Sequence, residues 1–122
     1  MKKYLDTYAL AEIAKGNKEF SIYLLEEFVI TDLTLVEFYA MLLREDGEKT
    51  AEYWFRRLEA YAVSVPRQIL KEAIIFRYQH RKQNISFFDA AGYIYSLRNS
   101  LPFVTGDKEF EKLPNVEFRK GN

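Results

Sequence analysis

The sequence contains no cysteine, one histidine, three prolines and five glycines. The absence of cysteine excludes disulfides and thiolate metal sites. No Pro- or Gly-rich stretch divides the 122 residues, so we expect a single domain over residues 1–122. No apolar run approaches the roughly 18 residues of a membrane span. Because Asp6 and Glu12 interrupt the apolar positions behind the basic start, we expect no signal peptide, no membrane partner and a cytoplasmic protein.

An excess of basic charge is also missing, because 18 Lys and Arg residues balance 18 Asp and Glu residues. A protein that coats nucleic acid through its net charge is usually basic. The local pattern is more informative than the total. Between residues 73 and 106, Asp89 is the only carboxylate. One acid therefore stands alone in a basic segment.

Short apolar runs that alternate with helical patterns are abundant. We expect strands at 4–5, 28–30, 61–65, 102–105 and 116–118, and helices at 8–15, 18–27, from 31–34 to about 45, 48–60, 66–82, 86–98 and 107–113. Short strands that alternate with helices favour a parallel sheet covered on both faces. The sequence therefore predicts an α/β protein, a three-layer α/β/α sandwich with a central parallel sheet of four or five short strands.

Four acids occupy similar settings. Asp6 and Asp107 each follow a predicted strand, where ligands bind in open α/β sheets. Glu37 is the only carboxylate in the apolar segment 33–43, and Asp89 lies in the first turn of a predicted helix. Each also has a simple structural explanation: Asp6 and Asp107 as helix caps, Glu37 in a capping box with Thr34, and Asp89 as a first-turn acid.

Four carboxylates in one crevice need a cation. Two of them about 4 Å apart repel by roughly 4 kcal/mol at an effective dielectric near 20. Such a cluster raises pKa values or destabilises the fold unless a cation lies between the acids. Oxygen ligands without His or Cys suit a hard ion, so the pattern favours Mg²⁺ or Mn²⁺.

Four segments resemble the acidic motifs of PIN-domain nucleases, and the likeness is greatest to the toxin subunit of VapBC-type toxin–antitoxin pairs. They are residues 4–7, 34–37, 88–91 and 104–107. The resemblance implies a metal-dependent endoribonuclease. Asp6, Glu37, Asp89 and Asp107 match the catalytic, metal-binding quartet, with Thr7 and Thr105 as supporting hydroxyls. Participation of Glu109, a further acid after the last motif, stays open.

The basic residues around Asp89 are candidate contacts to RNA phosphates. They are Arg77, Arg81, Lys82 and Arg98. Basic residues near helix C-termini also interact favourably with the helix dipole, which explains Arg81 and Lys82 equally well. His80 continues the apolar row of a predicted helix, so we interpret it as a packed or helix-end residue.

The resemblance implies an RNA substrate, a cognate antitoxin and a homodimer. Two alternatives stay open: a PIN-like protein that binds RNA or a partner without cutting, and a housekeeping RNA-processing nuclease. Two further classes that place acids around a phosphate group are less well supported. An aspartyl-phosphate phosphatase is disfavoured because Tyr8 stands where its second acid is needed. A phospho-receiver module is disfavoured because the interior acids lie on helical patterns.

Overall fold

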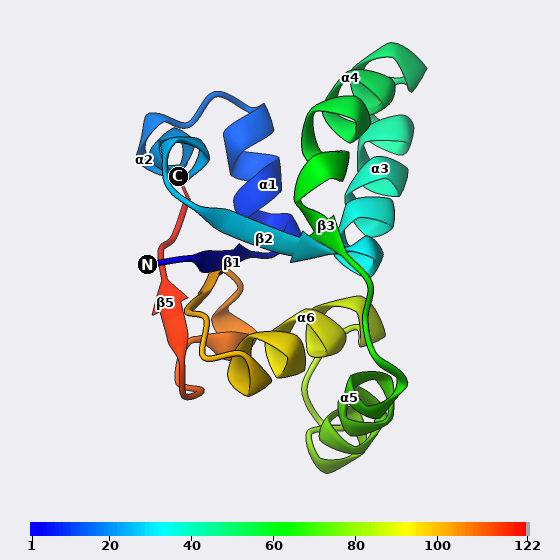
Figure 1. Ribbon diagram of the computed structural model, residues 1–122, viewed down its shortest axis with the longest axis vertical. Coiled ribbons are helices and arrows are strands. Elements are labelled where there is room, and N and C mark those ends of the chain that lie inside the picture. The colour runs from blue at the N-terminus through cyan, green and yellow to red at the C-terminus, as the bar shows by residue number, and fades with distance from the viewer. Residues whose placement is uncertain (122) are drawn as a thin grey trace.

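The computed structural model describes residues 1–121. Five strands form one parallel sheet in the order β3-β2-β1-β4-β5 (Figure 1). The strands are β1 Lys3–Leu5, β2 Phe28–Thr31, β3 Ala62–Val63, β4 Phe103–Thr105 and β5 Val116–Phe118. The predicted α/β/α class and its parallel sheet are confirmed, with β1 in the centre.

Helices cover both faces of the sheet. The α-helices are α1 Thr7–Ala14, α2 Lys18–Ser21, α3 Asp32–Asp46, α4 Glu48–Leu58, α5 Arg67–Gln79 and α6 Phe87–Arg98. Short 3₁₀ helices are η1 Ile22–Leu25, η2 Glu59–Tyr61 and η3 Lys108–Phe110. Helices α1 to α4 lie on one side and α5 and α6 on the other (Figure 1). Within residues 1–121, no helix is long and apolar enough to cross a membrane.

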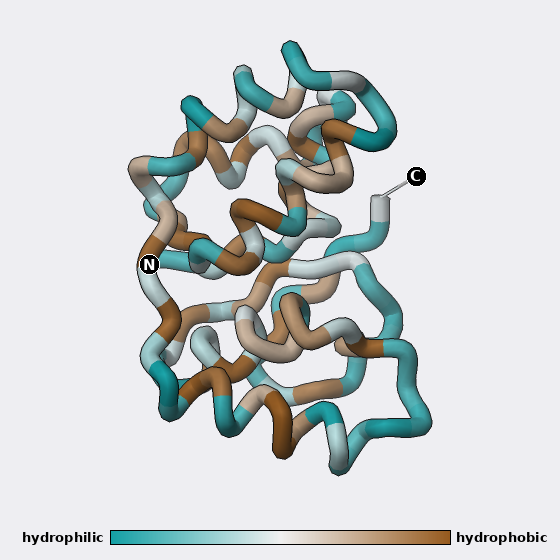
Figure 2. The backbone as a smooth tube through the Cα atoms, turned by 90° about the vertical axis from the view of Figure 1, so that its right-hand side faces the viewer, coloured by the Kyte–Doolittle hydropathy of each residue, from teal (hydrophilic) through white to brown (hydrophobic). Residues whose placement is uncertain are grey.

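Two hydrophobic cores follow from the alternation of side chains along the strands. Neighbouring strand residues enter opposite cores: Tyr4 and Leu5 in β1, Val29 and Ile30 in β2, Phe103 and Val104 in β4. All are at most 6% exposed, as expected for strands of a parallel sheet covered on both faces. Figure 2 shows hydrophobic stretches through the middle of the molecule and hydrophilic turns at the ends of the outer helices.

Several predicted elements are shorter than expected. The helix predicted over 18–27 ends its α-helical part at Ser21, continues as η1 and stops at Glu26, whose extended backbone leads into β2. The helix predicted to Lys82 ends at Gln79. The predicted helix 107–113 is a single 3₁₀ turn that buries Phe110. In each case the chain leaves the helix to reach its next strand or helix, although the sequence pattern would allow further helical residues.

The sheet register brings the first and last acids together. Leu5 is paired with Val104, and the amide of Asp6 donates to the carbonyl of Val104 at 3.2 Å. Asp6 and the turn that follows β4 therefore lie at the same edge, where the carboxyl ends of the two central strands meet.

Candidate active site

Asp6 ends β1 and caps α1. Its Oδ1 accepts a hydrogen bond from the amide of Ala9 at 2.9 Å, and its side chain is buried. Burial raises the pKa of Asp6 well above its usual range, and the charges of Asp89 and Asp107 raise it further. Hydrogen bonds from Thr105 and Ala9 lower this pKa in part. Asp6 thus caps α1, and its surroundings disfavour the charged form of its carboxyl group.

Glu37 lies on α3 and faces the end of β1. The hydroxyl of Thr7 donates to Glu37 Oε1, which joins the start of α1 to α3. The capping-box interpretation of Glu37 is wrong, because α3 begins at Asp32 and is capped by Thr31. Glu37 therefore sits in the second turn of the helix, too far along to reach the cap, and is free to take part in a site.

Asp89 approaches from α6. Ser86 caps this helix by accepting from the amide of Asp89 at 3.1 Å, so Asp89 occupies the predicted first turn. Burial, followed by the charges of Glu37 and Asp107, raises the pKa of Asp89 to about 7. The acids of three different segments therefore act on one another electrostatically.

Asp107 follows β4 in a short turn. Its amide donates to Thr105 Oγ1 at 3.0 Å, and its Oδ1 accepts from the amide of Glu109 at 3.0 Å. The predicted capping role is thus present, although the helix it caps is only the turn η3. Glu109 itself accepts from the amide of Asn84 at 3.2 Å and binds the turn between α5 and α6.

All four acids line one pocket of about 620 Å³ at the carboxyl ends of the strands. The structure therefore brings together four residues that are far apart in the sequence, and Thr7 lies in the same lining. Thr105 stands behind it, buried, and reaches Asp6 by its hydroxyl. Within residues 1–121, no three His, Asp or Glu side chains stand close enough to hold a bare ion by themselves. An ion here would keep part of its water shell, as Mg²⁺ commonly does with one or two protein carboxylates.

Tyr4 explains how the acids reach the pocket. Its buried hydroxyl lies 3.0 Å from Thr31 Oγ1 and 2.7 Å from Thr34 Oγ1, at the start of the helix that carries Glu37. On the other side, a Cβ at Gly92 would stand 2.7 Å from the Tyr4 hydroxyl, so only glycine allows α6 to approach this closely. One tyrosine two residues before Asp6 thus fixes the helices of both Glu37 and Asp89.

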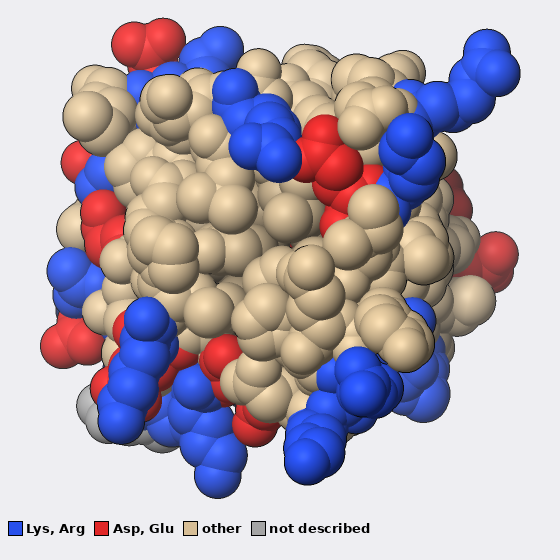
Figure 3. Space-filling view, turned by 90° about the horizontal axis from the view of Figure 1, so that it is seen from below, with Lys and Arg blue, Asp and Glu red and all other residues tan. Residues whose placement is uncertain are grey.

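The predicted basic contacts lie outside the pocket. Arg77 Nε donates to the carbonyl of Ile85 at 3.0 Å, and Arg98 forms an ion pair with Glu72. Arg81 lies over the Tyr78 ring, and Lys82 follows α5 at the surface. Figure 3, seen from below, shows Lys and Arg side chains around a mostly uncharged centre rather than one basic surface.

Other basic residues line the pocket instead. They are Arg44, Lys108 and Lys120. The signal for Arg44 was present in the sequence, because it stands seven residues after Glu37 and so on the same face of α3. Lys108 directly follows Asp107. Nothing in the local pattern indicated Lys120, which the fold brings from the far end of the described chain.

His80 is a packed helix-end residue, as predicted. It is the C-cap of α5, and its ring lies 4.1 Å from the ring of Phe76 between centroids. Its Nδ1 is 2.9 Å from the Phe76 carbonyl oxygen. Its ring thus belongs to the end of α5 and not to the acidic pocket.

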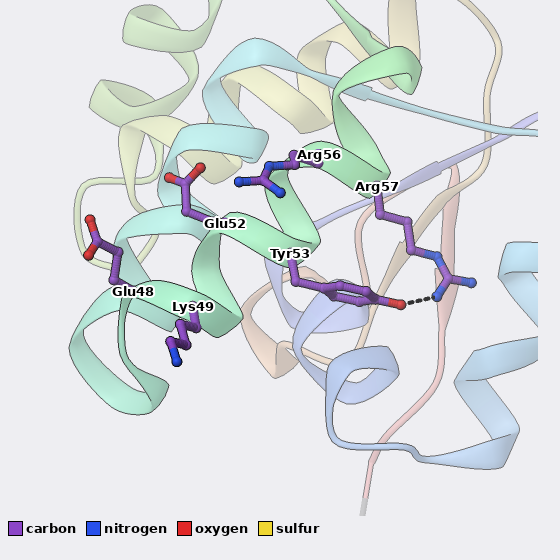
Figure 4. A pocket seen from close by; sticks show the side chains of 6 residues that line it. All are labelled: Glu48, Lys49, Glu52, Tyr53, Arg56 and Arg57. Atoms are coloured by element: carbon purple, nitrogen blue, oxygen red, sulfur yellow. Dashed lines mark hydrogen bonds between the residues drawn. The ribbon is translucent and has the colours of Figure 1, made fainter.

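A second hollow runs along the outer face of α4 (Figure 4). Its lining residues all come from this one helix: Glu48, Lys49, Glu52, Tyr53, Arg56 and Arg57. Tyr53 accepts a hydrogen bond from Arg57 at 2.9 Å, drawn as a dashed line in Figure 4. Side chains of a single helix face do not converge on one point, so the acidic pocket is the candidate active site.

A family model and several solved structures match this chain. A family model described as PIN domain matches residues 3–116. A toxin–antitoxin complex from Klebsiella pneumoniae superposes with a TM-score of 0.76 at 16% identity, covering 98% of this chain and 99% of that one. VapC20 of Mycobacterium tuberculosis, described as a toxin that cleaves the sarcin–ricin loop, gives 0.75 at 16% identity over 96% and 99%.

A third similar structure is VapBC2 from Rickettsia felis bound to a DNA fragment from its promoter. It gives a TM-score of 0.72 at 17% identity and covers all of both chains. At such identities these structures establish the fold. A search among curated proteins by sequence gives no match.

Proposed function

Since the chain belongs to the PIN domain family, we propose that it is a divalent-cation-dependent endoribonuclease and the toxin of a toxin–antitoxin pair. One observation carries the nuclease proposal: carboxylates from four separate segments meet in a single pocket. Capping alone does not explain this convergence, because a cap serves its own helix and needs no neighbour of like charge.

The donor set fits a hard cation. The pocket offers carboxylate oxygens from Asp6, Glu37, Asp89 and Asp107, with the Thr7 hydroxyl beside them and neither His nor Cys in its lining. These acids would hold Mg²⁺ or Mn²⁺. When bound, such a cation supplies a Lewis acid that activates water and offsets the charge on the attacked phosphate.

The protein's own groups would hold and orient the reacting parts. Thr7 fixes the Glu37 carboxylate, and the amide of Ala9 fixes Asp6, so two ligands are oriented before a cation arrives. No side chain is needed as a covalent nucleophile, because water attacks the phosphodiester. Contacts of Arg77, Arg81, Lys82 and Arg98 with RNA that extends beyond the pocket stay a prediction.

An antitoxin would cover an apolar groove that is separate from the acidic pocket. The groove is lined by α1, α2, η1 and α4, with Ile13, Ile22, Leu24, Leu25 and Trp54 as its apolar members. Leu25 is 88% exposed, which is unusual for a large apolar side chain in a region with several others. An amphipathic segment of the partner fits such a groove. When the product of the adjacent gene is co-expressed, Leu25→Asp is expected to abolish its copurification.

We also propose a homodimer. Helix α5 exposes Ile74, Ile75 and Tyr78, and Figure 2 shows a hydrophobic turn at the surface of this lowest helix. The face seen in Figure 3 is uncharged at its centre, as a protein-binding surface would be. Sedimentation equilibrium of the wild type and of Ile75→Glu tests this: the wild type is expected as a dimer and the variant as a monomer.

Cleavage of a mixed RNA pool tests the main proposal. The wild type is expected to cut RNA with Mg²⁺ or Mn²⁺ and to lose this activity with chelator. Asp6→Asn is expected to be inactive, whereas Asp46→Asn, a change of an exposed acid outside the pocket, keeps full activity. RNA binding without cleavage under every condition would favour the non-catalytic alternative.

The toxin role has its own test. Expression of the wild type in a bacterial host is expected to arrest growth, and expression of Asp6→Asn is not. Cleavage in vitro without growth arrest would favour a housekeeping RNA-processing nuclease.

A further inference from the structure

Lys120 lines the acidic pocket although it lies 13 residues after Asp107. It belongs to the segment 119–121, which follows β5 and crosses toward α1. The amide of Arg119 donates to the carbonyl of Thr105 at 2.9 Å and so extends the pairing of β5 with β4. The amide of Gly121 donates to the Tyr8 hydroxyl at 2.9 Å. Lys120 is therefore held between two anchored neighbours.

Close packing at two glycines, Gly106 beside the segment and Gly121 within it, fixes this segment further. A Cβ at Gly121 would lie 2.5 Å from the Glu12 carboxyl carbon, and Glu12 is itself held by Asn17 at 3.0 Å. A Cβ at Gly106 would lie 2.5 Å from the carbonyl oxygen of Arg119. A larger residue at Gly106 would meet the backbone of Arg119, whereas one at Gly121 would have to displace the Glu12 carboxylate from its hydrogen bond with Asn17. Together with the amide hydrogen bonds of Arg119 and Gly121, these contacts position the backbone of segment 119–121 so that the Lys120 side chain lies at the pocket.

Charge gives Lys120 a role there. The four acids of the pocket repel an RNA phosphate, and a divalent cation among them cancels only part of their charge. The Lys120 side chain is exposed at the pocket, with its Nζ 5.9 Å from the centre of the Tyr8 ring. Arg44, by comparison, lies 3.7 Å from Glu45 and is partly neutralised. An exposed ammonium beside a cluster of acids is placed to attract a phosphate that the acids alone would reject.

We propose that Lys120 binds a phosphate of the RNA substrate at the active site, and that the backbone of segment 119–121 positions the Lys120 side chain for this contact. The proposal rests on the proposed nuclease function and adds a substrate contact to it. It makes the packing of Gly121 against Glu12 part of substrate binding, since a displaced segment carries Lys120 away.

Steady-state cleavage and fluorescence anisotropy with a short single-stranded RNA, at several salt concentrations, test the proposal. Lys120→Met is expected to raise KM and Kd roughly threefold to tenfold, the effect of one exposed charged contact, with little change in kcat. Because one phosphate contact is lost, the slope of log Kd against log salt should fall by about 0.7. Lys120→Arg should keep wild-type values. Lys112→Met is the matched control, an exposed lysine that does not line the pocket.

Gly121→Val tests whether segment 119–121 positions Lys120. It is expected to raise KM as much as Lys120→Met does, while the double variant with Lys120→Met shows no further rise, because both changes remove the same contact. If Lys120→Met matches Lys112→Met in KM, Kd and salt slope, Lys120 binds no phosphate. An unchanged KM in Gly121→Val would refute the positioning role of segment 119–121.

Failure of the proposed function gives a different result. In that case the wild type cuts no RNA with either cation, and anisotropy alone decides about Lys120. Weaker binding by Lys120→Met would then support the phosphate contact in a non-catalytic protein. Absence of RNA binding by the wild type would overturn both proposals.

Discussion

Asp89→Asn is expected to stabilise the cation-free protein and to weaken its response to Mg²⁺. The pKa of Asp89 is raised from 3.8 to about 7, so between these values the folded state binds more protons than the unfolded state. The free energy of unfolding therefore falls as pH rises through this window, and the loss is complete above about pH 7. Asn carries no charge at any pH and escapes the loss.

The size of the effect follows from the same two values. The difference between a pKa of 3.8 and one of about 7 corresponds to about 4 kcal/mol. Because the Asp89 side chain is only half-buried, solvent screening reduces this to less than half. Loss of a first-turn acid from α6 subtracts about 0.5 kcal/mol. A net gain of about 1 kcal/mol remains, which raises the Tm of a domain of this size by roughly 4 °C.

Thermal unfolding with chelator at about pH 4 and pH 8 measures the stability of the cation-free protein, and subsequent addition of Mg²⁺ measures its response to the cation. Asp89→Asn should unfold higher than the wild type at pH 8 and no higher at pH 4. Mg²⁺ should raise the Tm of the wild type more than that of the variant. Glu27→Gln, a change of an exposed acid in the loop before β2, is the control and should follow the wild type throughout. A variant that is less stable at pH 8, or equally shifted at both pH values, would refute the idea that the pocket acids strain one another.

Three further changes probe the parts that support the site. Tyr4→Phe should lower the free energy of unfolding in urea by about 1–3 kcal/mol, because it removes the hydroxyl bonded to Thr34, and it should also slow cleavage as α3 loses its anchor. Gly106→Ala should lower the Tm clearly, since its Cβ would lie 2.1 Å from Tyr8 Cε1, with calorimetry as the measurement. Glu109→Gln should leave cleavage within about twofold of wild type, because Glu109 does not line the pocket and Gln keeps an oxygen that can accept from the amide of Asn84.

The acids were predictable because each stands out from its own neighbourhood. Asp6 and Asp107 follow apolar strands, Glu37 interrupts an apolar helix and Asp89 is the lone acid of a basic segment. Capping and pocket lining are not alternatives, because Asp6, Asp89 and Asp107 combine a place at the start of a helix with a place in the pocket. A helix that starts directly after a strand has its first residues at the sheet edge, so the two roles coincide.

The start of α3 was not predictable from local pattern. Thr31, Asp32 and Thr34 are all good N-caps within four residues, and propensity does not choose among them. The choice is made by Tyr4, whose buried hydroxyl contacts both threonines and so fixes where the helix begins. The capping box of Glu37 failed for this reason, since its distance from the cap depended on a contact 27 residues away in sequence.

The basic residues of the pocket show a different limit of sequence reasoning. Arg98 is only nine residues from Asp89, yet along a helix this separates them by about 14 Å, and Arg98 pairs with Glu72 at the far end of α6. Charge counted along the sequence therefore does not show which basic residues line the pocket. Lys120 reaches the acids because β5 pairs with β4 and two glycines let the next segment lie against α1. Its place is decided by strand pairing and steric fit over more than a hundred residues, so only the folded chain reveals it.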